Sequence, residues 1–174
     1  MKRIKVLLAV CMLGLALTGC LKNVPKEGVE YLKNGQYNEA AEKFEQAIAD
    51  GKKTGDAYRG LGIAKWELED YEGARDAFQS ALENGASKTG TLYNLIGSCE
   101  MNLGNPQAAL NYYRLGLEQE DISGELKREM EYNIIAAYEQ SGDWESAKVK
   151  LEHYISSYPD DENAKKELEF LGTR

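Results

Sequence analysis

The stretch YEGARDAFQSAL, residues 71–82, contains a clear helical pattern of apolar residues. Its small and large apolar residues recur every three to four positions, a spacing that places them on one face of an α-helix. They are Tyr71, Ala74, Phe78, Ala81 and Leu82. Small residues beside large ones on such a face let an antiparallel neighbour approach closely and interlock with it. The stretch therefore predicts one half of a tightly packed pair of helices.

The same small-then-large pair occurs four times along the chain. The pairs are Ala40 with Phe44, Ala74 with Phe78, Ala109 with Tyr113, and Ala147 with Leu151. They are separated by 34, 35 and 38 residues, a period typical of stacked helical repeats. A turn position precedes each pair by five residues, at Gly35, Glu69, Gly104 and Gly142. Glycine at three of these positions favours the left-handed conformation that ends a helix, so each pair should belong to the second helix of a hairpin.

The first helix of each hairpin is marked less completely. Its marks are Gly28, Leu61-Gly62, Ile96-Gly97 and Ile134-Ile135. With the pairs above, this frame resembles the tetratricopeptide repeat, although Pro106 stands where the family has an aromatic residue and Ile135 where it has glycine. The resemblance implies an all-α fold, a right-handed superhelical α-solenoid of about four helical hairpins plus a C-terminal capping helix. Asn105 is expected to cap the helix that Pro106 begins.

The repeat domain is predicted to span residues 24–174, with irregular points inside it and at its ends. Residues 118–124 form an insertion between the third and fourth hairpins and should be a solvated loop. The acids at positions 160–162 favour the start of a last helix that runs through Leu171, because negative charge is stabilised at a helix N-terminus. That helix is predicted to cap the stack, since an open end would expose an apolar stripe. At the other end, Pro25 suits the first turn of a helix.

The first residues predict an export signal. Lys2, Arg3 and Lys5 precede an uninterrupted apolar stretch over residues 6–17, a pattern typical of a signal peptide. At about 1.5 Å per residue this stretch would form a helix roughly 18 Å long, whereas the hydrocarbon core of a bilayer is about 30 Å thick. The stretch is therefore too short to anchor the chain by spanning a membrane.

A motif directly after the apolar stretch resembles the lipobox of bacterial lipoproteins. In Leu17-Thr18-Gly19-Cys20, small residues occupy the two positions before the cysteine. The resemblance implies cleavage of residues 1–19 as a signal peptide, a diacylglyceryl thioether on Cys20, and a short lipidated tether over residues 20–23. Two acyl chains hold a protein stably on a membrane. The alternative is an ordinary secretory signal followed by a coincidental cysteine.

The lipobox resemblance and the charge of the chain limit its partners. The resemblance implies an extracytoplasmic, lipid-anchored protein of the cell membrane, or of the outer membrane if the cell has one, because Leu21 follows the cysteine instead of aspartate. Loss of residues 1–19 removes three of the 21 Lys and Arg residues and none of the 29 Asp and Glu residues, leaving a net charge of −11. So acidic a chain repels nucleic acid, and no nucleic-acid partner is expected.

Residues that could support catalysis are sparse. His153 is the only histidine, lies between Glu152 and Tyr154 on a predicted helix, and is expected to face solvent. Cys99 is expected to act as a small buried apolar residue. The sequence contains no nucleophile elbow, phosphate-binding glycine loop or calcium-loop spacing. The chain is therefore predicted to be no enzyme and to require no metal or cofactor.

The resemblance also places candidate partner-binding residues on the inner faces of the first helices, which line a concave groove in the family. They are Arg59, Ile63 and Trp66, then Asn94, Ser98 and Met101, then Tyr132 and Asn133, with Glu139 as a further candidate. Aromatic residues, arginine and methionine are enriched in interfaces, where a few side chains dominate the binding energy. The alternative for Trp66 is a core position, and Trp144 is predicted to be core. A clamp for a terminal carboxylate is not expected, because its set of lysine, asparagine and arginine residues is incomplete here.

These inferences predict a membrane-anchored adaptor or scaffold that binds proteins or peptides of a cell-envelope complex. The first alternative is a binding protein for a small molecule or a glycan fragment, which would need a closed pocket in the groove. An enzyme is the last alternative, and it would need two carboxylates that converge in a cleft with shifted pKa values.

Overall fold

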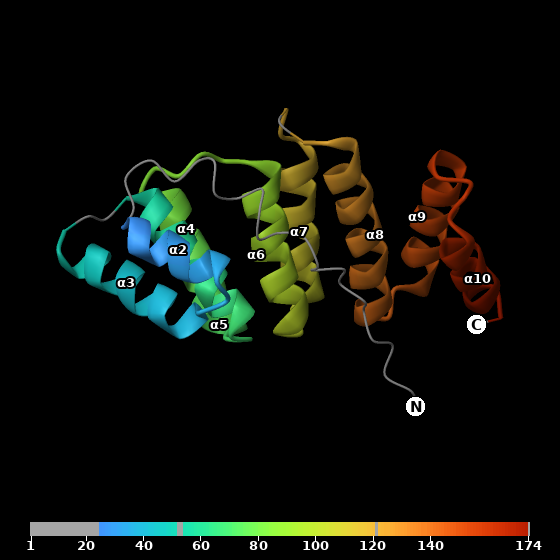
Figure 1. Ribbon diagram of the computed structural model, residues 1–174. Coiled ribbons are helices and arrows are strands. Elements are labelled where there is room, and N and C mark those ends of the chain that lie inside the picture. The colour runs from blue at the N-terminus through green and yellow to red at the C-terminus, as the bar shows by residue number, and fades with distance from the viewer. Residues whose placement is uncertain (1–24, 52–53, 121, 174) are drawn as a thin grey trace. The chain divides into compact units, whose positions relative to one another are not determined.

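A computed structural model describes residues 25–51, 54–120 and 122–173, and every regular element among them is an α-helix (Figure 1). The predicted signal peptide over residues 1–19 and the predicted tether over residues 20–23, which includes Cys20, lie outside the described residues. No helix in the described ranges combines the length and the apolar character needed to cross a bilayer. The chain forms two compact units, one ending at Ser87 and one beginning at Lys88.

The first unit contains two helical hairpins. They consist of α2 (Lys26–Lys33) with α3 (Tyr37–Ala49), and of α4 (Gly55–Glu67) with α5 (Tyr71–Glu83). Helix α3 also packs against α4, so that the two hairpins share one apolar core. That core contains Ala40, Phe44, Leu61, Ala64 and Ala77. The amphipathic helix predicted over residues 71–82 is confirmed as α5.

Glycine and phenylalanine interlock in the first unit. A Cβ atom added to Gly60 would lie 2.5 Å from the ring of Phe44, and one added to Gly62 would lie 2.5 Å from the ring of Phe78. Both rings are fully buried. Because these contacts leave no room for a side chain, the helices approach as closely as glycine permits, and the predicted packing of small against large residues is confirmed.

The second unit contains two hairpins and a final helix. Its elements are α6 (Gly90–Asn102), α7 (Pro106–Leu117), α8 (Gly124–Ser141), α9 (Trp144–Ser157) and α10 (Glu162–Leu171). Helix α7 packs against α8, and α10 packs against α9, as the predicted capping helix should. The last hairpin departs from the glycine-aromatic pattern, since α8 presents Ile135 and α9 presents Leu151 to a shared core. The end of this unit is therefore held by different contacts from the first unit.

The four predicted turn positions all adopt left-handed backbone conformations. Gly35, Gly104 and Gly142 have φ angles of 72°, 79° and 79°. Glu69 occupies the same position in the second hairpin with a φ angle of 61°. A side chain in this region is uncommon, so Glu69 shows that the turn geometry of the repeat is imposed even without glycine.

The helix boundaries confirm most of the predicted ends. Helix α7 ends at Leu117 and α8 begins at Gly124, so the predicted loop is confirmed to within its last residue. Helix α10 ends at Leu171, as expected. Helix α2 has 8 residues where α4 has 13, and Pro25 immediately precedes it. The first hairpin is thus shortened on the side of its first helix.

One predicted cap is wrong. Pro106 begins α7 as expected, but the side chain of Asn105 makes no capping hydrogen bond. Its Nδ2 atom instead donates a hydrogen bond to the Oε2 atom of Glu100 at 2.9 Å. Glu100 is itself buried, and its carboxylate competes for the amide that would otherwise have turned toward the start of α7.

Candidate functional site

The three groove candidates of the first unit lie on α4. Arg59 is buried, and its guanidinium lies 3.0 Å from the Oδ1 atom of Asp56 one helical turn earlier. Ile63 is half-buried. Trp66 is also half-buried, and its ring meets the ring of Tyr71 edge-on with centroids 5.0 Å apart. Arg59 and Trp66 are therefore engaged within the first unit.

The three candidates of α6 are largely enclosed. Asn94 and Ser98 are both buried. The hydroxyl groups of Ser98 and Tyr113 lie 3.3 Å apart and share a hydrogen bond. Met101 is half-buried and packs against the core cluster that contains Tyr113 and Met130. Ser98 and Met101 thus contribute mainly to the packing of α6 on its neighbours.

Asn94 instead joins a row of polar side chains that runs onto α8. Its Nδ2 atom donates a hydrogen bond to the Oε1 atom of Glu129 at 2.9 Å. Its Oδ1 atom accepts one from the Nδ2 atom of Asn133 at 3.3 Å. The neighbouring Tyr132 donates its hydroxyl proton to the Oε2 atom of Glu167 on α10 at 3.1 Å. We call these five residues, Asn94, Glu129, Tyr132, Asn133 and Glu167, the polar row.

The electrostatic surroundings of the polar row are anionic. Burial raises the pKa of Tyr132, and the negative charges of Glu167, Glu139 and Asp161 raise it further. Tyr132 therefore keeps its proton and acts as a hydrogen-bond donor at neutral pH. Three of the eight predicted groove residues, namely Asn94, Tyr132 and Asn133, come together in this row, whereas Arg59, Ile63 and Trp66 belong to the other unit.

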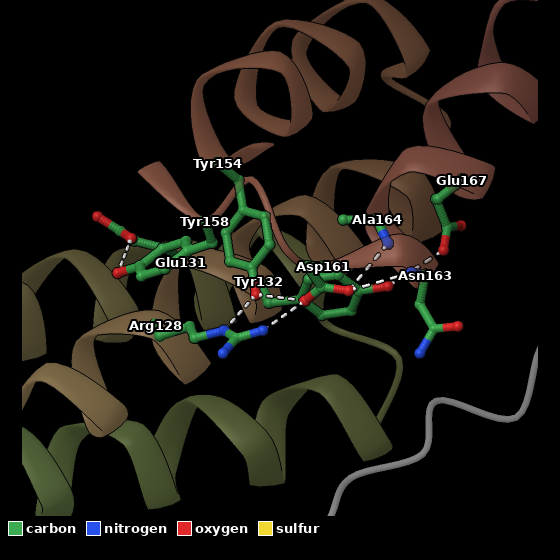
Figure 2. A network of polar contacts seen from close by, with 9 residues as sticks. All are labelled: Arg128, Glu131, Tyr132, Tyr154, Tyr158, Asp161, Asn163, Ala164 and Glu167. Atoms are coloured by element: carbon green, nitrogen blue, oxygen red, sulfur yellow. Dashed lines mark hydrogen bonds and ion pairs between the residues drawn. The ribbon is translucent and has the colours of Figure 1, made fainter. Parts of the chain in front are cut away.

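A second polar network lies beside the row and joins α8, α9 and α10 (Figure 2). The Nε atom of Arg128 donates to the hydroxyl of Tyr154 at 2.9 Å, and its terminal nitrogen donates to the Oδ2 atom of Asp161 at 2.7 Å. The Tyr154 hydroxyl donates to the same oxygen at 3.0 Å. The guanidinium also lies over the ring of Tyr158, 5.2 Å from its centroid. We call Arg128, Tyr154, Tyr158 and Asp161 the Arg128 network.

Asp161 connects this network to the start of α10. Its Oδ1 atom accepts hydrogen bonds from the backbone N–H groups of Asn163 and Ala164 at 3.2 and 3.1 Å. Burial raises the pKa of Asp161, but the hydrogen bonds from Arg128, Ala164 and Tyr154 lower it more, so its pKa lies below its ordinary value. One carboxylate thus caps α10 and ties that helix to α8 and α9.

A pocket of about 310 Å³ lies elsewhere, between α2 and α3. It is lined by Pro25, Lys26, Glu27, Lys43, Gln46, Ala47 and Asp50. An ion pair between Lys43 and Glu27, 2.7 Å long, lies in its lining. None of the predicted groove residues lines this pocket, so it provides no small-molecule site in the predicted place.

The side chains of types that could support catalysis lie as the sequence predicts. His153 is exposed, and Cys99 is fully buried. Trp144 is half-buried and packs against the core cluster around Leu151, in agreement with its predicted core position. No group of three or more His, Cys, Asp or Glu side chains within the described ranges could hold a metal ion.

Sequence reasoning missed Glu129, Glu167 and the Arg128 network. A signal for three of their contacts exists in the sequence, because each of these three joins residues about one repeat apart. Asn94 and Glu129 are separated by 35 residues, Tyr132 and Glu167 by 35, and Arg128 and Asp161 by 33. Equivalent positions in successive repeats lie side by side in a stack, so polar pairs at the repeat period are candidates for contact.

Comparison with known families and proteins agrees with this architecture. Models of the tetratricopeptide repeat match residues 26–90, 63–125 and 130–161. The heat-shock protein cognate (HSC) co-chaperone sgt12 of Aspergillus fumigatus is 37% identical over 60 residues. That match covers 33% of this chain and 18% of the co-chaperone, so the chain spans about a fifth of the length of this relative.

Two solved structures share the fold. The crystal structure of YrrB, a TPR protein with an unusual peptide-binding site, matches with a TM-score of 0.72 and 19% identity over 91% of this chain and 82% of that one. The crystal structure of MamA matches with a TM-score of 0.71 and 14% identity over 83% of this chain and 81% of that one. At such identities the likeness concerns the fold alone. The chain is an all-α solenoid and belongs to the tetratricopeptide repeat family.

Proposed function

We propose that this protein is a lipid-anchored scaffold of the cell envelope that binds proteins or peptides through its repeat domain. The family supports the protein-binding part, because tetratricopeptide repeats are typically interaction modules and not catalysts. The sequence Leu17-Thr18-Gly19-Cys20 after a short apolar stretch supports the anchor. The pairing of this motif with a helical repeat domain in one chain carries the proposal.

The proposed partner is not a protein tail held by a carboxylate clamp. Ser98 shares its hydrogen bond with Tyr113 and is not available as a clamp residue. Arg59 lies 3.0 Å from Asp56, but its buried Nε atom has no hydrogen-bond partner, so this side chain alone remains able to anchor an acidic group. Ile63, at a third clamp position, offers no hydrogen bond. The likeness to a co-chaperone covers too small a part of that protein to indicate a shared partner.

The anchor is tested by processing of the chain in cells. Mass spectrometry of the mature protein should find a thioether-linked diacylglyceryl group on Cys20, now the first residue. A Cys20→Ala variant should leave the membrane fraction, because a chain without acyl groups loses its hold on the bilayer. An unmodified Cys20, or a variant that stays with membranes as firmly as the wild type, would overturn this half of the proposal.

Partner binding is tested by crosslinking on intact cells, followed by purification of the full chain and identification of crosslinked peptides. The expected result is a protein recovered in stoichiometric amount with crosslinks to the repeat domain. A Phe78→Ala variant, which should lose the packed first unit, serves as a control for folding-dependent capture. Recovery of no stoichiometric partner with the wild-type protein would overturn the scaffold function.

A further inference from the structure

We propose that the polar row of the second unit binds a cationic segment of a protein partner, through lysine or arginine side chains. The inference rests on the proposed scaffold function and specifies the chemistry of its partner. It is carried by the hydrogen-bonding capacity of the row, by the pairing of the nearby basic side chains with other acids, and by the position of four of its five residues on α6 and α8, the first helices of their hairpins.

Hydrogen-bond acceptors outnumber donors in the row. Asn133 is 6% exposed, and the one hydrogen bond that it makes is donated by its Nδ2 atom to Asn94. Its Oδ1 atom accepts none from any described residue. This oxygen is not among the fully enclosed polar atoms that lack a partner, so it is open to a donor from outside the chain. A ligand that brings N–H groups to this oxygen would satisfy it.

Two carboxylates extend this acceptor surplus. Glu129 accepts a hydrogen bond from the neutral amide of Asn94, and Glu167 accepts one from the neutral hydroxyl of Tyr132. In each carboxylate the second oxygen accepts no hydrogen bond from a described residue, and neither carboxylate forms an ion pair with a described basic residue. Glu129 is exposed and Glu167 half-buried, so a partner can reach both.

The basic side chains close to the row are occupied by other acids. Arg128 is bound to Asp161 at 2.7 Å. Lys127 lies 4.0 Å from Glu131, and Lys165 lies 2.7 Å from Glu162. Lys166 acts on the same Glu162, whose pKa its charge helps to lower. The negative charge of the row is therefore left for a partner to neutralise.

The chemistry of the row selects a basic peptide over other cations and over anions. A divalent metal ion needs several converging carboxylates, and the described residues contain no such group of three. An acidic peptide or a nucleic acid would add negative charge beside Glu129 and Glu167, which is repulsive. Guanidinium and ammonium groups donate to carboxylate and amide oxygens alike, and these charge-assisted hydrogen bonds are the strong ones.

Binding of model peptides tests the inference on the full chain. The probes are fluorescent peptides of equal length in which alanine alternates with lysine, with glutamine or with glutamate, measured by anisotropy at low and physiological salt. The lysine peptide should bind and the other two should not. The Glu129→Gln and Glu167→Gln double variant should weaken lysine-peptide binding by about tenfold or more, the effect of losing charge-assisted hydrogen bonds.

A matched control separates this site from the general acidity of the chain. Glu145→Gln with Glu152→Gln removes the same charge from exposed positions of α9 and should change binding by less than about twofold. Glutamine is isosteric and can still accept the hydrogen bonds of Asn94 and Tyr132, and circular dichroism with thermal melting checks that both double variants fold. Equal weakening in the two variants, or no binding of the lysine peptide to the wild type, would overturn the inference.

The cellular crosslinking experiment distinguishes this failure from failure of the proposed function. A partner captured by the wild type should be lost from the Glu129→Gln and Glu167→Gln variant, with crosslinks that map to a lysine- or arginine-rich segment. A partner retained in full by that variant overturns the cationic site and leaves the scaffold function in place. Capture of no partner by the wild type overturns the scaffold function itself.

Discussion

The first unit and the α8–α10 end of the second unit solve the same packing problem with different chemistry. In the first unit, glycines on α4 contact the rings of Phe44 and Phe78, which are fully buried. At the α8–α10 end, Ile135 and Leu151 form the apolar contact, and Arg128 adds a polar network that holds α10. Close apolar packing stabilises a whole unit, whereas a half-exposed polar network fixes one helix.

The two regions should lose stability in different ways when a side chain is removed. Removal of a buried ring leaves a cavity that the surrounding helices cannot close, so the entire unit loses stability. Removal of a polar contact at the edge should free α10 alone, because α10 buries only Ala164 and Leu171. Four experiments test this difference between the two regions, from the largest expected effect to the smallest.

The largest effect is expected for Phe78→Ala. The ring is fully buried against Gly62, and its loss should cost about 3–5 kcal/mol of unfolding free energy. Urea unfolding followed by circular dichroism measures the change. Val149→Ala, at a side chain that is 58% exposed, should stay within about 0.5 kcal/mol. A cost below about 1 kcal/mol for Phe78→Ala would show that the packing of this ring against Gly62 is not a main source of stability in the first unit.

Gly62→Ala should come second. The new Cβ would lie 2.5 Å from the Phe78 ring, and the resulting shift should outweigh the better helix propensity of alanine, for a net loss of about 1–2 kcal/mol. Gly124→Ala is the matched control, since a Cβ there meets nothing within 4 Å. The same urea titration compares them. Equal stability of the two variants would mean that the first unit tolerates a looser approach of its helices.

Arg128→Ala should have a smaller and local effect. It removes hydrogen bonds to Tyr154 and Asp161, and because its side chain is 48% exposed the loss should be about 1 kcal/mol. Hydrogen exchange read by mass spectrometry should show faster exchange in α10 and unchanged exchange in α3 to α5. A loss of protection spread over both units would contradict the local role of the network.

The smallest effect is expected from pH. The pKa of Asp161 is lowered in the folded protein, so its contribution is fully present above the ordinary aspartate pKa of about 3.9 and is lost as pH falls through the lowered value. Protection factors of α10 should therefore decline below about pH 4. Asp161→Asn should abolish this pH dependence, and a decline of equal size in that variant would assign it to other carboxylates.

Much of the fold follows from local pattern in the sequence. Ala74 and Phe78 give the buried stripe, and Gly35, Gly104 and Gly142 give the turns, because helix periodicity and left-handed backbone depend on residues close in the chain. At Glu69 the residue type alone does not predict a turn, and the turn was predicted from the position of this residue in the repeat. The alignment of equivalent positions in the repeats predicted this turn, which residue composition alone would not have indicated.

The candidate site was less predictable for a physical reason. Asn94 and Asn133 were both predicted as groove residues and do contact each other, but Glu129, which accepts a hydrogen bond from Asn94, was one acid among many. Which acid receives a hydrogen bond depends on how two helices are offset, and that offset is set by side chains distributed over the whole hairpin. Asn105 failed as a cap for the same reason, because Glu100 lay within its reach.

The ring of Phe44 has one further consequence. A Cβ on Gly28 would lie 3.1 Å from it and one on Gly60 would lie 2.5 Å from it, so helices from two hairpins close on a single side chain. Opening either hairpin would therefore remove packing from the Phe44 ring. The first two hairpins should therefore unfold together, and a shortened chain that lacks the first hairpin would need a substitute for Phe44.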